Sequence, residues 1–156
     1  MPLSPDLFAK KSSATEWIDR DFARMTHLAL TKDDSATIGF VVACLFAGAI
    51  DIQELRSWAD HVLATSDACP TYITDLSTFD QPLFHIYRLI GFVPNSGLTD
   101  SERVALVGIA AARGRDPFEP LPTKEQSLAA LAAQRHLPAR FRATFPFIHF
   151  EDDHAA

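Results

Sequence analysis

Residues 36–50, ATIGFVVACLFAGAI, form the longest apolar run in the chain and contain no charged side chain. The run is shorter than the ~20 residues that a membrane-spanning helix requires, and Gly39 and Gly48 interrupt it. A helix that is apolar on all sides is usually buried in a protein core. We therefore expect residues 36–49 to form a buried helix with Asp34 as its N-terminal cap, and we expect no contact with a membrane.

Several helix-start signals surround this run. In four places a capping oxygen precedes a Glu or Gln by three residues, so that each side chain can bond the other's backbone. These pairs are Ser13 with Glu16, Asp51 with Glu54, Thr99 with Glu102, and Thr123 with Gln126. A further helix is predicted after Asp80, with Pro82 in its first turn and Leu83, Tyr87 and Ile90 facing inward.

Together these signals predict an all-α fold, a compact bundle of about six helices. The helix that starts at Thr99 is expected to end at Arg113 and Gly114, because a left-handed C-terminal cap favours glycine. Residues 71–76 alternate weakly between apolar and polar, so one short strand and a single helical turn are both open there. The proline-rich segment 116–122, DPFEPLP, cannot be helical and is interpreted as a connector.

Length and composition favour one domain. The chain has 156 residues, of which 47% are hydrophobic and 22% are charged, and this is enough to close a core without a metal or a disulfide. We expect a single domain over residues 1–156, with flexible ends at 1–12 and 151–156. Only Cys44 and Cys69 are present, and the N-terminus lacks the pattern of a secretory signal, so a cytoplasmic location is predicted.

Charge is distributed unevenly along the chain. Of the overall net charge of −6, the segment 51–102 accounts for −6 by itself, with eight acidic residues against Arg56 and Arg88. Residues 103–150 carry seven Lys or Arg and three acids. An acidic middle segment argues against nucleic acid as a partner and favours a basic protein. The alternative interpretation is an acidic surface that is only solvated.

Motifs for chemistry are missing from the sequence. It contains no glycine-rich phosphate loop, no His-Glu-x-x-His, no Gly-x-Ser-x-Gly and no paired-cysteine zinc motif. We therefore predict that the protein is not an enzyme and that it needs no cofactor and no metal.

Three weaker patterns in the sequence each have a functional and a simpler structural explanation. Cys44 would be a nucleophile if His27, His61 or His85 packed beside it, but its apolar neighbours predict a buried, inert thiol. The tail contains possible metal ligands near a terminus, where no fixed geometry is implied. The C-terminal phenylalanines form either a recognition segment or, as we prefer, a lid on the core. The tail ligands are His149, Glu151, Asp152, Asp153 and His154, and the phenylalanines are Phe141, Phe145, Phe147 and Phe150.

Short stretches of the middle of the chain resemble a known family. They are AIDIQELRSWAD (49–60), PTYITDLS (70–77), GFVP (91–94), LTDSERVAL (98–106), RG (113–114) and DPF (116–118). This region, roughly residues 49–120, is similar to small bacterial immunity proteins, in particular those of contact-dependent growth inhibition. Such proteins bind and block the toxic C-terminal domain of a delivered effector.

The resemblance implies a role without fixed binding residues, because members of this family each match their own toxin. It implies an inhibitor of a cognate toxin domain, and such toxins are often basic nucleases. We expect the protein alone to be a monomer, the simplest state for a one-to-one inhibitor. Asp51, Thr99 and Glu102 are expected to be occupied by helix capping. The acids that we expect to contact the partner are Asp60, Asp67, Asp75 and Asp80.

Two other function classes remain open from the residues alone. One is a small helical enzyme or ligand-binding domain with a pocket around Tyr72, His85 and Tyr87. The other is an adaptor domain whose acidic face binds an unrelated protein. A helix-turn-helix that binds DNA is disfavoured, because the helix pair within residues 36–64 lacks a basic recognition face.

Overall fold

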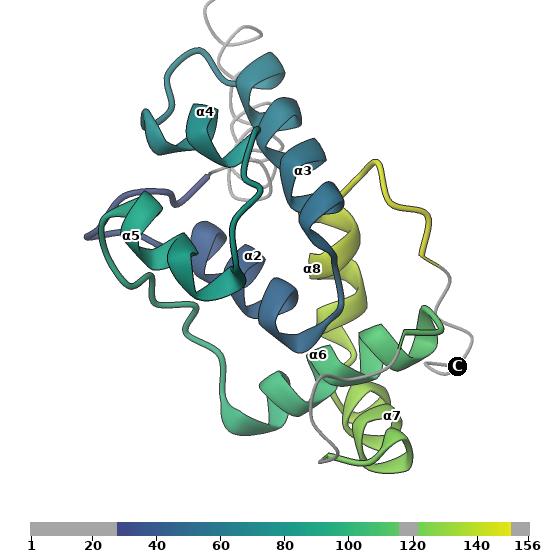
Figure 1. Cartoon of the computed structure of the whole chain (residues 1–156). Helices are drawn as coiled ribbons and strands as arrows, with labels where there is room; N and C mark the ends of the chain where they lie inside the picture. Colours follow the sequence, from purple (N-terminus) through teal and green to yellow (C-terminus); the bar gives the residue numbers. More distant parts are fainter. Residues whose placement is uncertain (1–27, 116–121, 151–156) are drawn as a thin grey trace, which may run out of the picture.

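The computed structural model describes residues 28–115 and 122–150, and this part of the chain is all-α, as predicted. It contains seven α-helices, one short 3-10 helix and no strand (Figure 1). The elements are α2 (Ala36–Ala47), α3 (Ile52–Thr65), α4 (Tyr72–Leu76), η1 (Leu83–His85), α5 (Ile86–Ile90), α6 (Asp100–Ala112), α7 (Lys124–Ala133) and α8 (His136–Thr144). The helix predicted after Ser13, the two ends predicted to be flexible and most of the 116–122 connector lie outside the described residues.

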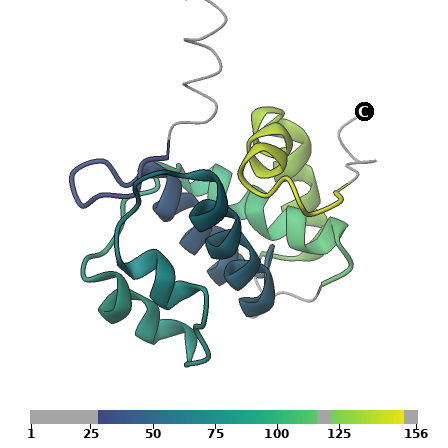
Figure 2. The same cartoon turned by 90° about the horizontal axis from the view of Figure 1, so that it is seen from above.

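Helix α2 lies at the centre of the molecule. Figures 1 and 2 show α4 and α5 on one side of it and α7 and α8 on the other. Ile38, Phe40, Val41 and Cys44 have no exposed surface at all. A glycine at its C-terminus, Gly48, adopts the left-handed conformation that ends the helix. The prediction of a buried helix is therefore confirmed, although the helix ends at Ala47 and not at residue 49.

The C-terminal segment closes the core on the α8 side of α2. Phe141 and Phe145 are fully buried with ring centroids 5.0 Å apart, and Phe150 stacks edge-on against Phe141 at 5.3 Å. Arg140 places its guanidinium 4.2 Å above the ring of Phe40 in α2, which is cation–π geometry. The interpretation of these phenylalanines as a lid on the core is confirmed, except that Phe147 remains 42% exposed.

The helix starts and the helix end that the sequence signals most clearly are confirmed. The capping boxes predicted at Asp51, Thr99 and Thr123 are all present, each with both reciprocal hydrogen bonds. Helix α6 ends as expected, because Gly114 is left-handed and the Arg115 N–H donates back to the carbonyl of Ala110.

Two predicted caps were wrong. The N-terminal cap of α2 falls on Ser35, because the backbone of Asp34 pairs with Thr31 in a tight turn. The helix predicted after Asp80 begins as a 3-10 turn capped by Pro82, whose carbonyl accepts from the His85 N–H. Proline therefore precedes the first turn and does not belong to it.

Two other predictions change in detail. Residues 72–76 form helix α4, which removes the strand alternative, and Tyr72, Ile73 and Leu76 are the buried residues at helical spacing. In the segment after Pro82, Ile86 and Ile90 are buried. Leu83 and Tyr87, which were expected inward with Ile90, are only half-buried.

Helices α6 and α7 approach each other closely at Gly108. A Cβ placed on Gly108 would lie 2.2 Å from the carbonyl oxygen of Ser127 and 2.9 Å from the Cβ of Leu131. The first of these atoms is backbone, so it cannot move without shifting α7. The close packing of the two helices therefore requires glycine at this position.

We expect Gly108→Ala to destabilise the protein by about 1–3 kcal/mol through overpacking, although alanine is the better helix former by about 1 kcal/mol. The measurement is the free energy of unfolding in urea, with Ser101→Ala, at an exposed position of the same helix, as the matched control. An unchanged or raised stability of Gly108→Ala would contradict the close packing of α6 and α7.

The first turn of α6 is also linked to α8. His136 lies 2.7 Å from Glu102, whose other oxygen accepts from the Thr99 N–H at 3.0 Å. These hydrogen bonds, first that of His136, hold the pKa of Glu102 below its ordinary value of 4.5. The Glu102 carboxylate therefore binds a proton more readily in the unfolded chain than in the folded one. Its contribution to folding stability is present above the unfolded-state pKa and is lost as the pH falls through the lowered folded-state pKa.

We therefore expect Glu102→Gln, which keeps the shape of the capping box, to lower stability by about 0.5–1 kcal/mol at pH 7. The difference from the wild type should shrink steadily as the pH falls from 5 toward 3. Urea unfolding at each pH measures it, and Glu125→Gln in the first turn of α7 is the control. A difference that grows on acidification would contradict the assigned direction of the pKa shift.

Candidate functional site

The four acids predicted to bind a partner all lie in the segment 52–80. Asp60 is in α3, Asp67 follows α3, Asp75 is in α4 and Asp80 follows α4. All four are exposed, and none forms an ion pair among the described residues. Segment 52–80, with α3 packed on α4, is called the acidic lobe below.

The remaining acids near the lobe are used by the fold. Glu54 pairs with both Arg113 and Arg115, and Arg113 also donates to the carbonyl of Ala49. Asp51 caps α3 and lies 3.3 Å from Arg115. The prediction that capping occupies Asp51, Thr99 and Glu102 is confirmed. These contacts join the start of α3 to the end of α6 and hold the lobe on the rest of the bundle.

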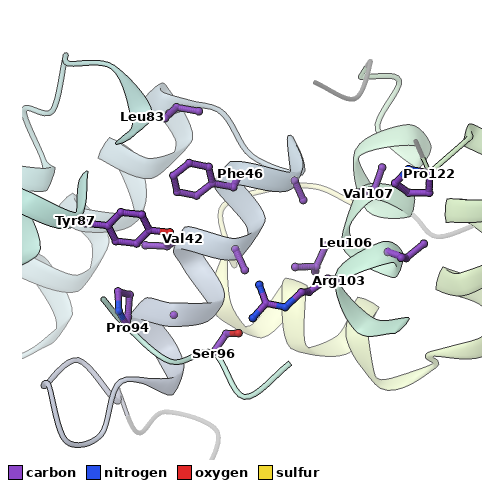
Figure 3. Close-up of a pocket in the computed structure, with 14 residues that line it drawn as sticks. Val42, Phe46, Leu83, Tyr87, Pro94, Ser96, Arg103, Leu106, Val107 and Pro122 are labelled. Atoms are coloured by element: carbon purple, nitrogen blue, oxygen red, sulfur yellow. The ribbon is translucent and has the colours of Figure 1, made fainter. Parts of the chain in front are cut away.

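A cavity of about 520 Å³ lies between α2, α5 and α6, which is within the size range of small-molecule sites. Its floor is formed by one side of α2. Tyr87 and Leu83 form one wall, α6 forms the opposite wall, and the 94–96 loop closes one end (Figure 3). The residues of the floor are Gly39, Val42, Ala43, Phe46 and Ala47.

Two contacts shape this cavity. The ring of Tyr87 stacks nearly parallel on that of Phe46, with centroids 5.7 Å apart and planes 9° apart. At the other end, a Cβ on Gly39 would lie 2.5 Å from the backbone nitrogen of Ser96, so the loop rests directly on the helix backbone. The Asn95 N–H also donates to the hydroxyl of Ser35 at 2.8 Å.

Three polar side chains face the apolar floor. Figure 3 shows Arg103 extending from α6 toward α2, with Ser96 on the loop at one end of the cavity and Tyr87 on the opposite wall. Arg103 has no ion pair among the described residues. No Asp or Glu is among the described residues that line the cavity. The arrangement therefore offers hydrogen-bond donors and one cation beside an apolar surface.

The pocket predicted around Tyr72, His85 and Tyr87 is only partly correct, because Tyr87 alone lines the cavity. The Tyr72 hydroxyl donates to the carbonyl of Leu30 in the core. His85 instead packs against the ring of Phe84, with centroids 4.5 Å apart. Sequence reasoning missed Arg103, because nothing local distinguishes it from other surface cations on a helix.

None of the other candidate sites is assembled within the described residues. Burial raises the pKa of Cys44 far above its ordinary value, and His61 lies against Phe147. The candidate His27 lies outside the described residues, as do all of the tail's possible metal ligands except His149. Within residues 28–115 and 122–150, no three His, Cys, Asp or Glu side chains are grouped to hold a metal.

We expect Cys44 to resist thiol reagents in the native protein, because its side chain is fully buried and its thiolate is strongly disfavoured. Titration with a disulfide reagent should label one thiol per native chain, that of the half-buried Cys69, and two in denaturant. Cys69→Ser should abolish the native labelling, whereas Cys44→Ser should leave it unchanged. Rapid labelling of Cys44 in the folded protein would revive the nucleophile interpretation.

None of the helices in the described part of the chain has the length and apolarity needed to cross a bilayer. No protein-family model, no curated protein and no solved structure matches the chain.

Proposed function

We propose that this protein is an immunity protein that binds and neutralises the toxin domain of a contact-dependent growth inhibition effector. The observation that carries the proposal is the acidic lobe, where Asp60, Asp67, Asp75 and Asp80 are exposed and form no ion pair among the described residues. The family resemblance over residues 49–120, which includes the lobe, supports the same function.

The negative charge of the acidic lobe suits an inhibitor of a basic toxin. A toxin that cleaves nucleic acid presents a basic surface to its substrate, and carboxylates without intramolecular partners attract that surface. Opposite charges across an interface raise the association rate and select the correct partner. The lobe is held to α6 by Glu54 and Arg113, so little ordering is needed when a partner binds.

The first test is co-expression of the protein with the C-terminal domain of the large effector encoded immediately upstream. Rescue of growth and co-purification of a stable complex are the expected results. Absence of such an effector, or absence of rescue, would overturn the proposal.

The second test locates the interface. Asp67→Lys with Asp80→Lys reverses two exposed loop charges, and we expect it to slow association by about ten-fold or more and to weaken its salt dependence. Stopped-flow or surface binding kinetics measure both quantities. The control, Asp33→Lys with Glu125→Lys, makes the same charge change at exposed acids outside the lobe. Equal rates for the two double variants would exclude the lobe from the interface.

A further inference from the structure

We propose that the cavity between α2, α5 and α6 is a binding site for a small apolar carboxylate, with Arg103 holding the carboxylate group. This inference is independent of the proposed immunity function, because the cavity is distinct from the acidic lobe. It begins from the composition of the lining, which combines an apolar floor with donors and a cation but no described acid.

The floor is shaped for an apolar body. Ile38, Phe40, Val41 and Cys44 of α2 are fully buried, yet along this side Ala43 and Ala47 are half-buried and Phe46 is 37% exposed. The parallel pair of Phe46 and Tyr87 provides a flat aromatic surface at one wall. This apolar surface lies inside a concave site and is partly open to water. Binding of an alkyl or aryl group there removes both apolar surfaces from water, which is favourable.

The polar groups select an anion. Arg103 extends from the first turn of α6 toward the cavity and has no ion pair among the described residues. A guanidinium can hold both oxygens of a carboxylate at once. Its charge makes an anionic group the natural complement, and the absence of a described carboxylate from the lining leaves that position open.

Ser96 gives a second, independent indication. The residue is only 7% exposed, and its oxygen accepts from the Leu98 N–H at 3.3 Å. Its own O–H has no acceptor among the described residues, although a buried hydroxyl normally has one. Ser96, on the 94–96 loop, and Arg103, on α6, line the same cavity (Figure 3).

The size of the cavity restricts the ligand further. A volume of about 520 Å³ suits a small molecule and is far too small for a protein segment with its own fold. Alkyl and aryl carboxylates share the required chemistry, and the flat wall formed by Phe46 and Tyr87 accommodates either. Octanoate and 3-phenylpropionate are therefore the two probes, and their neutral amides are the matched controls.

The experiment is titration of the full chain with each probe, followed by calorimetry and by amide chemical shifts of residues around the cavity. We expect saturable binding of at least one carboxylate and about 10- to 100-fold weaker binding of its amide. The stronger probe identifies the body as alkyl or aryl. Equal affinity for acid and amide, or no binding of either acid, would overturn the proposal.

Variants assign the roles of individual residues. Arg103→Met should remove the preference for acid over amide, whereas Arg103→Lys should retain part of it. Arg135→Met, which removes an exposed charge elsewhere, should bind as the wild type does. Ala43→Leu should fill the floor and weaken acid and amide alike. An unchanged acid preference in a folded Arg103→Met variant would contradict the assignment.

Discussion

The burial of helix α2 is the constraint on which the rest of the structure depends. Its side chains at Ile38, Phe40, Val41 and Cys44 are removed completely from water, and each large one contributes about 1.5–3 kcal/mol. No single neighbouring helix can cover a cylinder that is apolar on nearly all sides. The bundle therefore packs helices around α2 from two directions, as Figure 2 shows, and the pair of α6 with α7 adds a second layer through the contact at Gly108.

The cavity follows from the same constraint. Helices α5 and α6 form opposite walls of the cavity, and between them one stripe of the surface of α2 stays partly open, with Phe46 37% exposed. The 94–96 loop contacts the backbone at Gly39 and closes only one end of that stripe. The site is thus a partly open stripe of the central helix, edged by core side chains such as Leu106 and by the polar side chains of Arg103 and Ser96.

Local signals in the sequence were sufficient for most of the helices. A capping box needs only residues three apart, and the boxes at Asp51, Thr99 and Thr123 were predictable for that reason. The caps proposed at Asp34 and Asp80 failed because a tight turn and a proline decide those starts. The cavity was not predictable, since it joins residues as distant in the chain as Gly39 and Val107, which are 68 positions apart, and no local spacing reports that arrangement.

The charged residues fall into two groups, those that hold the helices together and those that make no such contact among the described residues. Glu54 and Glu102 are occupied by pairs or caps that fix α3 and α6, so changing them alters folding as well as any function. The four aspartates of the lobe and Arg103 make no such contacts among the described residues. Exposed charges of this kind contribute little to stability. Because the fold does not constrain the four aspartates of the lobe and Arg103, these positions are open to selection for binding. The two proposals therefore rest on these residues and not on the charged residues that hold the helices together.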